Sequence, residues 1–158
     1  MAHITAKEEY RSLVERINLF SQGAPAHKLL FQILEILFSR KEAAFVSQMP
    51  IKPFTASDAA RLSGLPEAEV RKLLDELSSR AVLVDTEVEG QMRYFLPPPM
   101  AGFFEFSLMR VRTDIDQKLL SELFHQYINV EEDFIRELVV PGETGLGRIF
   151  LNEAALDC

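Results

Sequence analysis

The side chains that could bind a metal ion or act as nucleophiles are few in this sequence and lie far apart. Its imidazole and thiol groups belong to His3, His27, His125 and Cys158. A structural metal site needs several such ligands at close, defined spacing, and a cysteine nucleophile needs a base placed beside it. We therefore predict no metal site, no catalytic residue and no enzymatic activity, and we expect His125 to be an ordinary histidine on a helix.

Two other polar patterns have structural explanations. Residues 131–133 are Glu-Glu-Asp in the expected first turn of a helix, where the helix dipole stabilises carboxylates. Residues 141–147 are rich in glycine, but they lack the Lys and adjoining Ser/Thr of a phosphate-binding loop, and no predicted strand precedes them. We interpret this second pattern as a loop that follows a helix.

A helix-turn-helix followed by a hairpin is predicted over residues 54–99. Thr55 with Asp58 can cap a first helix, Gly64 provides the turn, and Pro66 lies at or beside the start of a second helix. Two β-rich runs, residues 82–88 and 91–96, are joined by a Glu-Gly pair that suits a tight hairpin. The second helix buries one face through residues at three- and four-residue steps, namely Val70, Leu73, Leu74 and Leu77. This order of elements is typical of a winged helix.

Helices are also predicted on both sides of this unit. Residues 8–20 are amphipathic, and a second helix begins near Ala26 and continues past a polar break at residues 39–42. The predicted fold is therefore mainly α with a small β-hairpin, a winged helix-turn-helix flanked by N- and C-terminal helices. Its parts are an N-terminal helix (1–25), a winged-helix domain (26–99) and a C-terminal helical extension (100–158), packed as one globular unit.

The C-terminal extension is predicted to contain three helices. The first covers residues 100–110, Thr113 with Asp116 caps the second, and Asn129 with Glu132 caps the third.

Two apolar segments are candidates for a partner interface. The predicted helix at residues 29–38 is apolar almost all round, which is typical of a helix buried on most sides. It is either the central core helix of one chain or a contact with a second copy. The aromatic block at residues 103–109 is expected to lie in the core or at a partner surface rather than in a cofactor pocket. The candidate interface residues are Leu29, Ile33, Ile36, Phe103, Phe104, Phe106 and Met109.

The charge balance argues against general binding to nucleic acids. The net charge is −7, from 17 basic and 24 acidic residues, whereas binding to nucleic acids or anionic membranes relies on basic side chains. A local footprint for DNA remains as an alternative, and it would consist of Arg71, Lys72 and Arg93. However, acidic residues outnumber these cations on both elements. They are Glu67, Glu69, Asp75 and Glu76 on the second helix, and Asp85, Glu87 and Glu89 on the hairpin.

The expected compartment is the cytoplasm. A single cysteine suits a reducing environment. The N-terminal residues lack the apolar segment of a signal peptide, and no apolar run reaches the length of a membrane span.

Three strings resemble a known family. They are PIKPFTA (50–56), LPPPMAGFFEFSLMRVR (96–112) and DIDQKLLSELFHQYINVEEDFIREL (114–138). They are similar to the N-terminal region of bacterial and archaeal iron-sulfur proteins of the 4Fe-4S ferredoxin type. The resemblance implies a winged-helix-like region that precedes a cysteine-rich, cluster-binding part. One thiolate cannot hold a cluster that takes four, so the resemblance implies clusters in a further C-terminal region and none in this chain.

Two functions of different classes follow. The first, implied by the resemblance, is a docking domain of a longer electron-transfer or redox-sensing protein, whose partner is the cluster domain, a redox partner or a second copy. The second is a dimeric winged-helix transcriptional regulator, which would place two copies of Arg71 and Lys72 about 34 Å apart on DNA. A weaker third alternative is a small-molecule sensor whose pocket is lined by the aromatic block.

Overall fold

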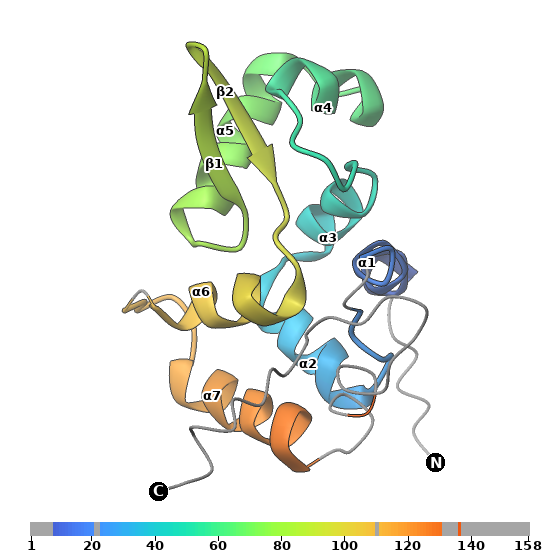
Figure 1. Ribbon diagram of the computed structural model, residues 1–158, viewed down its shortest axis with the longest axis vertical. Coiled ribbons are helices and arrows are strands. Elements are labelled where there is room, and N and C mark those ends of the chain that lie inside the picture. Colours follow the sequence, from blue (N-terminus) through green and yellow to red (C-terminus); the bar gives the residue numbers. More distant parts are fainter. Residues whose placement is uncertain (1–7, 21–22, 110, 131–135, 137–158) are drawn as a thin grey trace, which may run out of the picture.

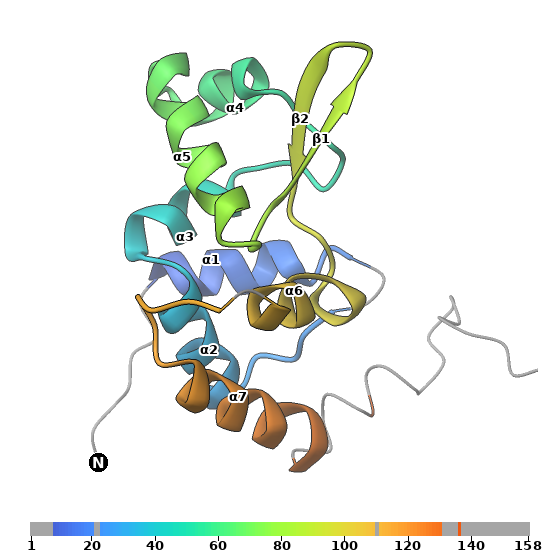
Figure 2. The same cartoon turned by 90° about the vertical axis from the view of Figure 1, so that its left-hand side faces the viewer.

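The computed structural model describes residues 8–20, 23–109, 111–130 and 136 (Figures 1 and 2). This part of the chain is mainly helical with a two-stranded antiparallel sheet, which confirms the predicted mainly α class with a small hairpin. The hairpin, α4 and α5 lie at one end of the molecule, and α2, α6 and α7 at the other (Figure 1). The elements are α1 (Glu8–Ile17), α2 (Lys28–Leu37), α3 (Arg40–Ser47), α4 (Ala56–Ser63), α5 (Glu67–Ser79), β1 (Val84–Val88), β2 (Gln91–Phe95), the π-helical turn η1 (Pro99–Phe103), α6 (Phe104–Met109), α7 (Gln117–His125) and the π-helical turn η2 (Gln126–Val130).

Helix α4 begins and ends at the residues predicted from the sequence, Thr55 with Asp58 at its start and Gly64 at its end. The Asp58 amide donates to the Thr55 hydroxyl at 3.1 Å, and the Asp58 carboxylate accepts from the Thr55 amide at 3.2 Å. Hydrogen bonds from the Thr55 side chain and backbone hold the pKa of Asp58 below its usual value. Gly64 then ends α4 with a left-handed φ of 71°. The predicted capping box and turn are confirmed.

The hairpin turn is also as predicted. Glu89 and Gly90 both have positive φ, 53° and 74°, as a two-residue type I′ turn requires. β1 and β2 pair with Val88 opposite Gln91 and Val84 opposite Phe95. One further pairing was not expected, because Phe54 and Tyr94 exchange two backbone hydrogen bonds of 2.9 and 2.8 Å. Phe54 thus extends the sheet at the outer edge of β2.

The aromatic residues of η1, α6 and α7 form the core at the other end of the molecule. The Phe104 ring lies 4.8 Å from the Phe103 ring and 4.8 Å from the Phe124 ring, between centroids. Phe103 also contacts Phe38 edge-on. The Tyr127 hydroxyl donates to the Pro25 carbonyl at 2.8 Å. These contacts join the C-terminal helices to the chain before and after α2.

Two predicted helix boundaries are wrong. Residues 39–42 are not a polar break within one helix, because α2 ends at Leu37 and Ser39 caps the separate helix α3 in a capping box with Glu42. Thr113 does not cap α7, since Asp116 is itself the N-cap and accepts from the Leu119 amide at 2.9 Å. The helix expected after Asn129, the acidic run at 131–133, the glycine-rich residues 141–147, His3 and Cys158 lie outside the described residues.

The end of α5 is a Schellman motif with alanine at the position that usually holds glycine. The Val82 amide donates to the Leu77 carbonyl at 3.3 Å, and the Ala81 amide donates to the Ser78 carbonyl at 2.9 Å. This geometry requires a left-handed residue, and Ala81 has a φ of 57°. An L-residue with a Cβ is strained in this conformation.

We expect Ala81→Gly to raise the free energy of unfolding by about 1 kcal/mol, because glycine adopts the left-handed conformation without strain. Urea unfolding measures the change. The matched control is Ala68→Gly, an exposed position in the first turn of the right-handed helix α5, where the same change should lower stability by up to about 1 kcal/mol. A loss of stability in both variants would contradict the left-handed assignment of Ala81.

Candidate partner-binding surface

Three residues of the predicted interface lie in the core instead. Ile33 and Phe103 are 0% exposed and Phe104 is 2% exposed. They are covered by this chain's own C-terminal helices, since α7 packs on α2 and α6 packs on α7. α2 is therefore a core helix of one chain, and the prediction that these three residues face a partner is corrected.

The other four candidates are at least partly accessible. Leu29 and Ile36 are partly buried against the same core, and Phe106 is partly buried on α6. Met109, at the end of α6, is 76% exposed. Next to it, Leu108 is 38% exposed and Val111 is 94% exposed. The accessible part of the aromatic block thus lies at its C-terminal end.

An open groove of about 390 Å³ lies where α6 passes the end of α5 and the start of β1. We call it the apolar groove, and its lining residues are Ser78, Ala81, Leu83, Val84, Asp85, Phe106 and Met109. Phe106 and Met109 were predicted as interface residues, whereas the residues from β1 and the end of α5 were missed. No local signal could have found them, because the groove exists only where α6 is packed beside the hairpin.

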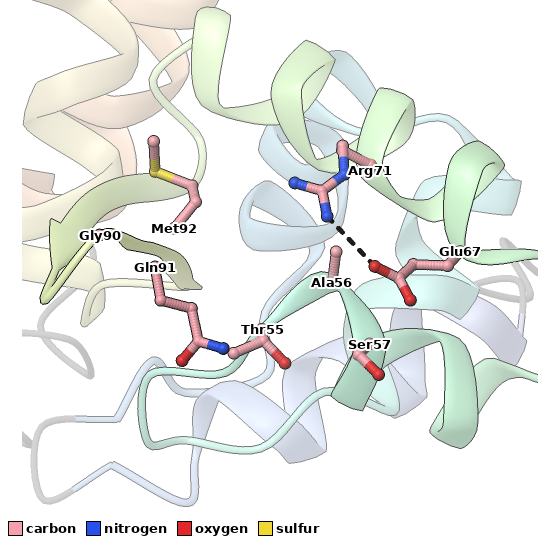
Figure 3. Close-up of a pocket in the computed structure, with 8 residues that line it drawn as sticks. All are labelled: Thr55, Ala56, Ser57, Glu67, Arg71, Gly90, Gln91 and Met92. Carbon is pink, nitrogen blue, oxygen red and sulfur yellow. Dashed lines mark hydrogen bonds and ion pairs between the residues drawn. The ribbon is translucent and has the colours of Figure 1, made fainter.

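A second, smaller cleft of about 200 Å³ lies between the hairpin, α4 and α5 (Figure 3). Figure 3 shows Gln91 and Met92 of β2 across from Arg71 of α5, with Thr55 and Ser57 from the start of α4. Arg71 is engaged in an ion pair with Glu67 at 3.1 Å between Nη2 and Oε1. The cation that lines this cleft therefore has a carboxylate partner from its own helix.

The three candidate DNA contacts lie on two elements and differ in exposure. Arg71 and Lys72 are exposed on α5. Arg93 lies on β2 and is only partly exposed. The acidic side chains of the hairpin, Asp85, Glu87 and Glu89, are all exposed.

A side-chain hydrogen bond joins the hairpin to α5. The Tyr94 hydroxyl donates to the Asp75 carboxylate at 2.7 Å. Burial of the phenol, followed by this bond and the charge of Asp75, raises the pKa of Tyr94 to about 12. The neutral phenol is therefore the form that stabilises the hairpin's position.

This contact predicts a loss of stability in alkaline solution. The pKa of Tyr94 is about 10 in the unfolded chain and about 12 in the folded one. Its neutral phenol therefore stabilises the fold fully below pH 10, and this stabilisation is lost as the pH rises towards about 12. At about pH 9 we expect Tyr94→Phe to be less stable than the wild type by about 1 kcal/mol. At about pH 11 the difference in free energy of unfolding between the wild type and Tyr94→Phe should be smaller. The decrease should be about 1 kcal/mol at most, because solvent screens the charge of the exposed Asp75. Unfolding in urea at both pH values measures the difference, and a constant difference would contradict this assignment.

Comparison with known proteins gives no relative, since no protein-family model, curated protein or solved structure matches the chain. Within the described residues, no group of three or more His, Cys, Asp or Glu side chains is placed to hold a metal ion. None of the helices in that part is long and apolar enough to cross a membrane.

Proposed function

We propose that this chain is a non-enzymatic docking domain with a winged-helix arrangement, the N-terminal part of a 4Fe-4S ferredoxin-type protein in electron transfer or redox sensing. The partner is the cluster-bearing domain. One observation carries the proposal: the surface offered by α5 and the hairpin is acidic, while an apolar groove with the exposed Met109 opens beside it.

The order and pairing of the elements support the winged-helix part of the proposal. Helix α3 is followed by the extended residue Phe54, then by α4, the Gly64 turn, α5 and the hairpin. The pairing of Phe54 with Tyr94 adds a short strand to the hairpin, on the side of β2. A helix, strand, helix, helix and hairpin in this order are what a winged helix requires.

The charges of α5 support docking over DNA binding. Between Glu67 and Glu76 this helix has two basic and four acidic residues, and Arg71 is paired with Glu67. Phosphate contacts supply most non-specific affinity for DNA, so these carboxylates would weaken the approach of a duplex.

The apolar groove supports a protein partner. Met109 lines it and exposes most of its surface, and exposed apolar patches with polar rims mark protein interaction sites. The resemblance to iron-sulfur proteins makes the cluster-bearing domain the occupant, because that domain would be joined to this one and held at high effective concentration.

The experiment is a calorimetric titration of the chain with a purified two-cluster 4Fe-4S ferredoxin domain. We expect saturable binding that Met109→Glu weakens at least about tenfold, since a charge would be buried in the apolar contact. Leu19→Glu is the matched control, because Leu19 is also an exposed apolar residue (65%) but follows α1. Absence of binding, or equal weakening by both variants, would contradict the proposal.

A dimeric DNA-binding regulator is the second candidate. The observation that favours it is the exposure of Arg71 and Lys72 on α5, the second helix of the helix-turn-helix. It would require two copies that present these residues about 34 Å apart.

A further inference from the structure

The outer edge of β1 has unpaired backbone groups, and the hydrogen-bond pattern identifies them. Tyr94 uses its amide and its carbonyl to pair with Phe54, so these groups point away from β1. Residues directly opposite in an antiparallel pair are either both bonded to each other or both turned outward. Asp85 lies opposite Tyr94, and Glu87 opposite Met92 two residues on. The amides and carbonyls of Asp85 and Glu87 therefore point away from β2.

Nothing in the described part of the chain covers this edge. Asp85 and Glu87 are exposed, and within the described residues no backbone hydrogen bond outside the hairpin reaches them. In Figure 1, β1 is the outer strand of the hairpin, and in Figure 2, where that side faces the viewer, no helix lies in front of it. An edge of this kind can accept an additional strand.

The charge of the edge selects the kind of strand. Asp85 and Glu87 have no ion pair among the described residues, and their side chains lie on one face of the sheet, next to the position that an added strand would occupy. If two copies of this chain paired through β1, these carboxylates would lie near each other and repel. Lysine or arginine at alternate positions of an incoming strand would instead form favourable cross-strand pairs.

The apolar groove continues from the same edge. Val84 and Asp85, at the start of β1, line the groove together with Phe106 and Met109 of α6. A strand added to β1 would therefore pass from the acidic edge directly into the groove. Side chains at alternate positions of an added strand enter such recesses, and this gives strand addition its sequence preference.

We propose that β1 accepts an extended segment of a partner protein as an additional strand, with basic residues opposite Asp85 and Glu87 and an apolar residue in the apolar groove. This inference rests on the proposed docking function and specifies the partner segment. The backbone bonds supply affinity, and the acidic edge and the groove supply selectivity.

The test measures fluorescence anisotropy of a short labelled peptide in which lysine and valine alternate and which ends in leucine. We expect saturable binding that falls at least about tenfold when alternate peptide amides are N-methylated, because that removes the hydrogen bonds of one strand edge. The double variant Asp85→Lys with Glu87→Lys should reduce binding at least about tenfold and should bind a glutamate-valine peptide instead. The control pair Glu15→Lys with Glu122→Lys makes the same change in net charge at exposed sites on α1 and α7, and it should bind within about twofold of wild type.

Two outcomes would overturn the inference. If the N-methylated peptide bound as tightly as the unmodified peptide, the peptide would be held by charge attraction and not by strand addition. Absence of peptide binding, with binding to the ferredoxin domain retained, would mean that the acidic edge serves only to prevent aggregation. The second outcome would contradict the peptide site but not the docking function. Conversely, absence of ferredoxin binding with peptide binding retained would contradict the docking function but not the peptide site.

Discussion

Replacing Phe104 with alanine is expected to lower the free energy of unfolding by about 3–5 kcal/mol, the range for removal of a buried aromatic ring. Phe104 is 2% exposed, and its ring contacts Phe103, Phe124 and Tyr127. Its contacts with Phe124 and Tyr127 help to pack α6 on α7 and η2. Its loss would leave a cavity that three other aromatic rings cannot fill.

Urea unfolding of Phe104→Ala measures this effect. Met109→Ala is the matched control on the same helix, because Met109 is 76% exposed and its truncation should change stability by about 0.5 kcal/mol or less. A loss below about 1 kcal/mol for Phe104→Ala would mean that α7 does not cover this side chain, and the aromatic block would again be a candidate interface.

Replacing Arg16 with alanine is expected to cost about 2–4 kcal/mol, through lost hydrogen bonds and lost packing of the aliphatic stem. Arg16 is 3% exposed. Its Nε donates to the Met49 carbonyl at 3.2 Å and its Nη2 to the Pro50 carbonyl at 2.7 Å. The side chain therefore ties α1 to the chain that leaves α3, and burial lowers its pKa to about 10.

The matched control is Arg11→Ala, since Arg11 is an exposed arginine on the same helix. It should change stability by about 0.5 kcal/mol or less. Equal effects of the two substitutions in thermal or urea unfolding would show that the contacts of Arg16 with the two carbonyls contribute nothing.

The features predicted correctly depend on neighbours in the sequence. Thr55 and Asp58 cap α4 because they lie three residues apart, and Glu89 with Gly90 forms the turn because glycine tolerates positive φ. The same reasoning could have found the capping box of Ser39 and Glu42. The apolar residues on both sides of it suggested one continuous helix instead.

The candidate surface was predicted less well, because it depends on contacts between distant residues. The spacing of Phe103, Phe104 and Phe106 does not say which ring faces α7 and which faces the hairpin. The pairing of Phe54 with Tyr94 joins residues on different elements, so the free edge of β1 could not be predicted either. Composition did predict the acidic character of α5 and the hairpin.

We propose that the surface of α5 and the hairpin serves a protein partner rather than DNA. The most direct test is fluorescence anisotropy of the chain with labelled mixed-sequence DNA fragments at about 50 mM and about 200 mM salt, where phosphate contacts cause a steep loss of affinity. We predict no binding at either salt concentration. Binding that weakens with salt and is abolished by Arg71→Glu with Lys72→Glu would contradict the docking account and identify a DNA-binding regulator.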